Sequence, residues 1–175
     1  MTLPLNHTGI VTVTFLCLSL IMGCGYQMVG KETHVPPGLT SVSIPTFQNM
    51  TYEPGIEIQF TQAFLREFIL DKRVKVVSRA EADSTLEGVI MSFTIYSVAY
   101  NRAGFVSQYE AAVVMNLALK DRAGKVLWQE KGLSETVWFR ASSSGLINET
   151  NKQAAIQEAG RLAAGQIKNR YFYNF

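Results

Sequence analysis

The residue whose surroundings point most directly to chemistry is Cys24, in the stretch Leu20–Tyr26 that reads LIMGCGY. A cysteine thiol can act as a nucleophile or carry a covalent group. Three structures could place it there: a buried core strand, a transmembrane helix, or a processing site that turns the cysteine into a membrane anchor. The apolar run before it, Gly9–Met22, has 14 residues. A spanning helix needs about 20 apolar residues, whereas the apolar region of a secretory signal needs about 7–15. The length therefore favours a processed signal.

The residues around the thiol support this interpretation. Ile21-Met22-Gly23-Cys24 resembles the bacterial lipobox, an aliphatic-x-small-Cys pattern. In such signals the thiol receives a diacylglycerol, the chain is cut before the cysteine, and the new amino group is acylated. We therefore predict a signal peptide at residues 1–23, a lipidated tether at 24–40 and a folded domain at 41–175. Residues 1–23 contain no Lys or Arg, which leaves open a cleaved or uncleaved anchor without lipid.

The predicted lipid on Cys24 would include palmitate as an amide-linked acyl chain, and no other cofactor is expected. One acyl chain binds a membrane only marginally, and several chains anchor it stably. Gly25 and Tyr26 rather than Asp follow the cysteine. By resemblance to enterobacterial sorting rules, this predicts an outer-membrane protein on the periplasmic side.

Residues that could carry catalysis are scarce beyond this point. Removing residues 1–23 leaves a single histidine, His34, beside two prolines in the tether, which is a poor place to orient a general base. No His/Cys cluster has metal-ligand spacing. Glu81 and Asp83 form an acidic pair in a polar stretch, and we expect them to be solvated. The sequence therefore predicts neither an enzyme nor a metal site.

Composition sets the remaining limits. The 152 residues after position 23 are enough for one domain. All 16 basic and 14 acidic residues follow position 30, so the net charge of +2 belongs to this domain and is too small to suggest nucleic acid binding. Cys17 would leave with the signal, which excludes a disulfide within the mature chain.

Hydrophobic spacing predicts the elements of the domain. Residues 41–45 alternate as a strand, and four apolar residues at steps of four predict a helix over 54–70: Ile56, Phe60, Phe64 and Phe68. Residues 74–77 form a short β-branched run. Residues 86–100 read as a strand whose apolar phase is odd from Val89 and becomes even at Tyr96, which predicts a bulge near Ile95.

The remaining chain predicts a hairpin pair and a helix. Residues 109–119 alternate strictly, and turns are expected at 101–104 and 121–125. Residues 126–140 return as a strand. Thr150 and Gln153 have the form of a capping box for a helix reaching about Tyr171. The predicted fold is α+β, with two helices on one mostly antiparallel or mixed sheet of about four strands.

Three segments carry a family resemblance. GCGYQMVG at 23–30, RAEADSTLEGVI at 79–90 and YNRAGFVSQYEAAVVMNLAL at 100–119 resemble the outer-membrane lipopolysaccharide-assembly lipoproteins of the LptE family. The resemblance covers residues 23–172. It implies a lipoprotein that plugs and helps to assemble an LptD-type β-barrel translocon and contacts lipopolysaccharide on its way to the outer leaflet.

The resemblance also implies ligand contacts. A basic residue of the family's central loop matches Arg102, and its alternative is an ordinary solvated turn residue. A second basic residue precedes the last helix in some members, where this chain has Glu149 at the matching place and Lys152 nearby. Arg102 and Lys152 are therefore the candidate lipopolysaccharide contacts.

Two other classes of function remain open at this stage. A lipoprotein scaffold or activator of a periplasmic cell-wall synthase would share the anchor, and an envelope hydrolase would need a histidine that the domain lacks. The aromatic end of the chain, Tyr171–Phe175, is interpreted either as a helix end packed on the sheet or as an exposed docking edge.

Overall fold

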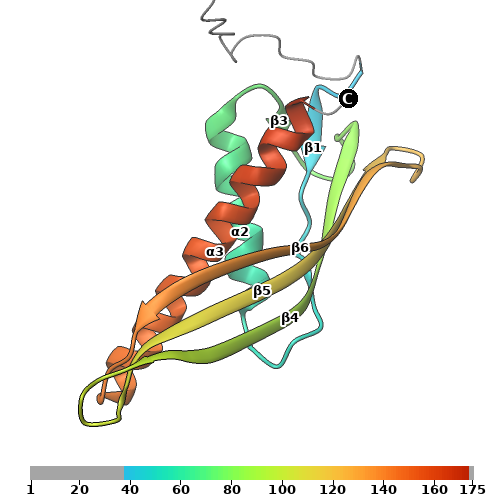
Figure 1. Cartoon of the computed structure of the whole chain (residues 1–175). Coiled ribbons are helices and arrows are strands. Elements are labelled where there is room, and N and C mark those ends of the chain that lie inside the picture. Colours follow the sequence, from blue (N-terminus) through green and yellow to red (C-terminus); the bar gives the residue numbers. More distant parts are fainter. Residues whose placement is uncertain (1–37, 174–175) are drawn as a thin grey trace, which may run out of the picture. The chain divides into compact units, whose positions relative to one another are not determined.

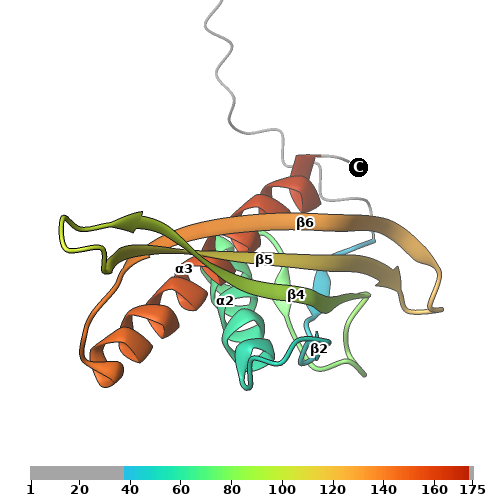
Figure 2. The ribbon, with the colours of Figure 1, turned by 60° about the horizontal axis from the view of Figure 1, so that its bottom comes forward.

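The computed structural model describes residues 38–173. This part of the chain is α+β, as predicted: two helices lie against one face of a mixed sheet (Figures 1 and 2). The elements, in chain order, are β1 (Ser41–Ser43), β2 (Gln48–Asn49), α2 (Ile56–Asp71), β3 (Lys75–Val76), β4 (Ser84–Tyr100), β5 (Val106–Asp121), β6 (Val126–Arg140) and α3 (Gly145–Tyr173).

The sheet has six strands rather than about four, because two-residue strands add to it. Its order is β3-β1-β4-β5-β6, with β2 also paired to β4. β1 runs parallel to β3 and β4, β2 runs parallel to β4, and the three long strands β4, β5 and β6 are antiparallel neighbours. The long strands therefore form a meander, and short parallel strands extend one end of it.

The predicted phase of β4 is wrong. Its first half buries the even-numbered residues Leu86, Gly88 and Ile90, while Met91 is exposed. The register shifts lie between Ile90 and Ser92 and again between Ser97 and Tyr100, not near Ile95. The first shift moves Phe93 onto the core face. The odd apolar pattern misled the prediction because Gly88, which has no side chain, occupies a core position.

The other two long strands and their turn are confirmed. In β5 five of the six odd-numbered residues of the predicted strand are buried, and Tyr109 is half-buried; the five are Ala111, Val113, Met115, Leu117 and Leu119. The turn to β6 is closed by the amide of Gly124, which donates to the carbonyl of Asp121. Gly124 has φ 84°, a left-handed conformation that suits glycine.

Helix α2 buries the predicted stripe, since Ile56, Phe60, Phe64 and Phe68 are all fully buried. It packs against α3 where Ala63 meets Gly160: a methyl group added at Gly160 would lie 3.2 Å from the Ala63 Cβ. The predicted start of α3 is wrong. The helix begins at Gly145, and the Thr150 hydroxyl donates to the carbonyl of Leu146 within it instead of capping it.

The end of α3 joins the core. Tyr171 is buried, its ring meets Phe68 edge to face at 5.5 Å, and its hydroxyl lies 3.3 Å from the Ser84 hydroxyl. This residue therefore supports the packed alternative for the aromatic end of the chain.

Candidate functional site

Arg102 lies on a hydrogen-bonded turn at the end of the β4–β5 hairpin. The Asn101 amide donates to the carbonyl of Phe105 at 2.8 Å, and the Asn101 side-chain oxygen accepts from the amides of Ala103 and Phe105. Gly104 completes the turn with φ 80°. These bonds fix the backbone on both sides of Arg102, whose side chain is exposed. The turn therefore presents a fixed positive charge to solvent.

Two large apolar side chains flank this turn, and others lie farther along the sheet. Tyr100 and Phe105, which flank the turn, are 63% and 70% exposed. On the sheet face opposite the helices, Tyr96, Glu110 and Trp138 form one row across the three long strands. The Trp138 indole donates to the Glu110 carboxylate at 2.7 Å, yet Trp138 stays 65% exposed. A cation among apolar groups suits an amphiphilic partner better than a purely ionic one.

Lys152 is differently placed, in α3 and not on the turn. Its ammonium group forms ion pairs with Glu53 at 2.7 Å and with Glu149 at 3.0 Å, and its side chain is 18% exposed. Burial, the largest influence, lowers the pKa of Lys152, but the hydrogen bonds to Glu53 and Glu149 outweigh it and leave that pKa above its ordinary value. Lys152 thus ties α3 to the loop before α2.

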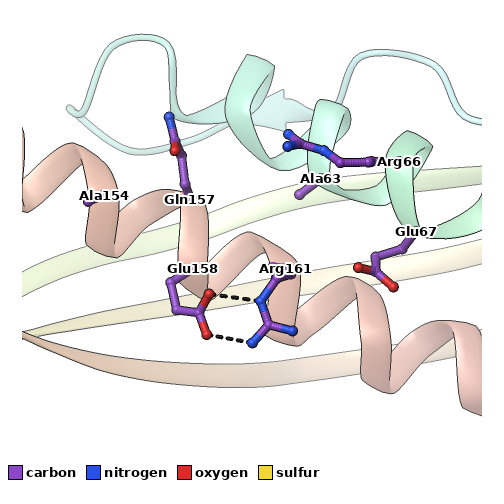
Figure 3. A pocket seen from close by; sticks show the side chains of 7 residues that line it. All are labelled: Ala63, Arg66, Glu67, Ala154, Gln157, Glu158 and Arg161. Carbon is purple, nitrogen blue, oxygen red and sulfur yellow. Dashed lines mark hydrogen bonds and ion pairs between the residues drawn. The ribbon is translucent and has the colours of Figure 1, made fainter. Parts of the chain in front are cut away.

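A cleft of about 240 Å³ lies between the two helices (Figure 3). Its lining residues are Ala63, Arg66, Glu67, Ala154, Gln157, Glu158 and Arg161. Arg161 and Glu158 form a two-bond ion pair within α3, at 2.8 and 2.5 Å. The lining has equal numbers of basic and acidic side chains and no hydroxyl, thiol or imidazole group, so it offers no nucleophile and no net charge for a ligand.

Asp83 is not simply solvated, which corrects the expectation for this residue. Its carboxylate accepts hydrogen bonds from the amides and hydroxyls of Thr40 and Ser41, at 2.8–3.1 Å. The Ser41 hydroxyl, followed by that of Thr40, holds the pKa of Asp83 below its ordinary value. Asp83 therefore fastens the start of β1 to β4 and has a structural role.

Cys24, the predicted lipid site, lies outside the described residues. Neither described helix is long and apolar enough to cross a membrane. Within residues 38–173, no three His, Cys, Asp or Glu side chains are grouped so that they could hold a metal ion. Arg102 therefore lies on the turn between Tyr100 and Phe105, whereas Lys152 lies in α3.

Solved structures with the same fold come from bacterial lipoproteins. A lipoprotein from Caulobacter crescentus CB15 superposes with a TM-score of 0.55 at 13% identity, covering 77% of this chain and 90% of that one. Lipoprotein B from Nitrosomonas europaea gives 0.53 at 15% identity, covering 85% and 90%. No curated protein sequence matches the chain. At this identity the two likenesses show a shared fold, a small α+β domain.

The sequence identifies the family within this class. Residues 39–171 match the family LptE, described as lipopolysaccharide-assembly. The chain belongs to the LptE family, which confirms the resemblance read from the sequence. It is a lipopolysaccharide-assembly lipoprotein, and it is not an enzyme because the family is non-enzymatic.

Sequence reasoning missed the apolar groups around the turn. The spacing predicts Tyr96 and Tyr100 only as strand residues, although the stretch Met91–Tyr100 contains no charged residue. That lack of charge was the available signal.

Proposed function

We propose that this protein is anchored in the outer membrane by lipid on Cys24, faces the periplasm, and plugs and helps to assemble an LptD-type β-barrel translocon. In this role it contacts lipopolysaccharide as the lipid passes to the outer leaflet. The observation that carries the proposal is family membership over residues 39–171. A small domain of mixed surface polarity suits a plug.

Arg102 is the proposed lipopolysaccharide contact. Lipopolysaccharide carries phosphates and anionic sugars, and a guanidinium group presents a planar fork to phosphate oxygens. The turn holds Arg102 exposed beside Tyr100 and Phe105, so one molecule can meet both charge and apolar surface. A phosphate can reach Lys152 only by replacing Glu53 or Glu149, and we expect a smaller contribution from that residue.

The ligand test compares lipopolysaccharide binding by wild type, Arg102→Ala and Arg102→Glu at two ionic strengths. A charge-assisted hydrogen bond contributes about 1.5–3 kcal/mol, which corresponds to about 10- to 150-fold in affinity. Because Arg102 is exposed to water, we expect a loss near the lower end of this range, about tenfold. The Glu variant should bind more weakly than the Ala variant because it adds repulsion, and both differences should shrink in high salt. Circular dichroism controls for folding. Unchanged affinity of the Glu variant in low salt would remove Arg102 from the site.

The partner test is depletion of the protein in cells. Depletion should lower the amount of correctly assembled barrel and make the cells permeable to large apolar antibiotics. An intact permeability barrier with altered cell shape would instead support a scaffold of a cell-wall synthase.

A further inference from the structure

The outer edge of β4 is unpaired over its second half. β1 pairs with β4 at Ser84–Thr85, and β2 pairs with it at Val89–Ile90. The last bond on this side joins the Met50 amide to the carbonyl of Ile90 at 2.9 Å. Within residues 38–173, the segment Met91–Tyr100 then pairs only with β5 on its inner side. An open edge of this kind presents backbone N–H and C=O groups that another strand can use.

Charged residues do not protect this edge, although register shifts bound its regular part, Ser92–Ser97. Met91–Tyr100 reads MSFTIYSVAY, without a charged residue, proline or glycine. Charged residues and prolines are among the features with which proteins normally protect edge strands. The opposite edge of the same sheet follows the rule: β6 carries Glu130, Lys131, Glu135 and Arg140, and Gly132 interrupts it with φ 71°. The chain therefore places charged residues along one edge and none along the other.

The open edge is apolar as well as uncharged. Met91, Tyr96, Val98 and Tyr100 are each between 45% and 63% exposed. Beside the start of the segment lies a hollow of about 490 Å³ between β4 and the loop before α2, lined by Met50, Thr51, Tyr52, Glu53 and residues 91–95. The one charged group in this lining, Glu53, is neutralised by Lys152. The hollow can accept apolar side chains from an added strand, but it has no unpaired charge to bind a charged side chain.

We propose that an extended, uncharged and mainly apolar segment of the barrel partner adds to Met91–Tyr100 as a further β-strand. This inference rests on the proposed function, because that function supplies the partner. A second copy of the chain is a poorer occupant. Edge-to-edge pairing would join ten residues from each copy, whereas stable interfaces use about 20–30 residues a side. A plug enclosed by a barrel gains further contact area from the barrel wall. The added strand would then fix the orientation of the plug within the barrel.

The test uses a matched pair of substitutions. Thr94 and Thr136 are both exposed and lie in one row of the sheet, each opposite Ala112, with Thr94 on the open edge and Thr136 on the protected one. Lysine on an edge opposes strand addition. The full-length chain, wild type or with Thr94→Lys or Thr136→Lys, is purified from outer membranes, and the barrel recovered with it is measured. In a second experiment a photoreactive phenylalanine analogue replaces Tyr96, and the crosslinked peptide is identified.

We expect Thr94→Lys to lower barrel recovery by about tenfold and Thr136→Lys to change it by less than about twofold. The Tyr96 probe should crosslink to an extended, uncharged segment of the barrel. The strand addition would be overturned by equal barrel recovery with both variants or by a crosslink to a second copy of the chain. In either case the proposed function would still stand, provided that wild type recovers the barrel. Failure of wild type to recover any barrel would overturn the proposed function and with it the partner assigned to this edge.

Discussion

One methyl group added at Gly88 should lower the free energy of unfolding, because the space beside this glycine is already filled. A Cβ built at Gly88 would lie 2.8 Å from the Phe47 Cδ1 and Cγ atoms and 3.0 Å from its Cδ2 atom. Carbon atoms in favourable contact are about 3.5–4.0 Å apart. The Phe47 ring would have to move by roughly 0.7 Å or more to accept the methyl group. Gly88→Ala therefore tests whether that ring covers the strand.

The ring has little room to move. Phe47 is 3% exposed, its ring meets that of the fully buried Phe64 edge to face at 4.9 Å, and its amide donates to the Thr61 hydroxyl at 2.9 Å. Overpacking of this kind costs about 1–3 kcal/mol. Replacing glycine by alanine in a strand recovers about 0.5–1 kcal/mol of backbone entropy, and Gly88 has no positive φ to oppose it. The expected net loss in free energy of unfolding is about 1–2 kcal/mol.

The assay is urea unfolding of the chain without its first 24 residues, followed by circular dichroism. Gly165→Ala is the control, because nothing lies within 4 Å of a Cβ at that position of α3, and it should stabilise the domain. In a Phe47→Leu background, Gly88→Ala should cost about 1 kcal/mol less than in wild type. Equal stability of Gly88→Ala and wild type, or purely additive effects in the double variant, would refute this packing.

Three further outcomes are expected. Glu135 is buried, and that burial raises its pKa. A raised pKa lowers the stability of the fold as pH rises from the ordinary carboxyl range through the folded value, so Glu135→Gln should stabilise the domain at pH 7 in thermal melts, with a difference that disappears in acid. Cys24→Ala should abolish metabolic labelling by a fatty acid, and equal labelling of this variant would exclude lipid at the site. Asn101→Ala should speed hydrogen exchange at the Ala103 and Phe105 amides by about tenfold, as measured by NMR. The midpoint of urea unfolding should not change.

The sequence predicted elements well where the polarity of each side chain matches its own burial. The alternation in β5 and the phenylalanine spacing in α2 depend only on local burial, so both were readable. The phase of β4 was not readable, because Phe47 covers Gly88 from 41 positions away along the chain. The start of α3 was misplaced because Thr150, which has the type of a capping residue, bonds backward inside the helix.

The candidate site was likewise predictable from the sequence only in part. The turn around Arg102 follows from four adjacent residues, Asn101–Gly104, and the sequence located it correctly. The pairing of Lys152 with Glu53 joins residues 99 positions apart, which no local pattern encodes. Family membership supplied what neither the turn nor the pairing could indicate, namely the biological process.

The parallel pairing of β1 with β4 has a consequence for the order of folding. The register joins Val42 to Ser84 across the whole of α2 and β3, whereas the β4–β5 and β5–β6 ladders close through short turns. Contacts between distant residues carry a larger loop-closure entropy and form later than local ones. The meander can therefore assemble first, with β1 joining it only after α2 has formed. β1, which continues from the predicted membrane tether, is then secured late, together with β3, which pairs only with β1.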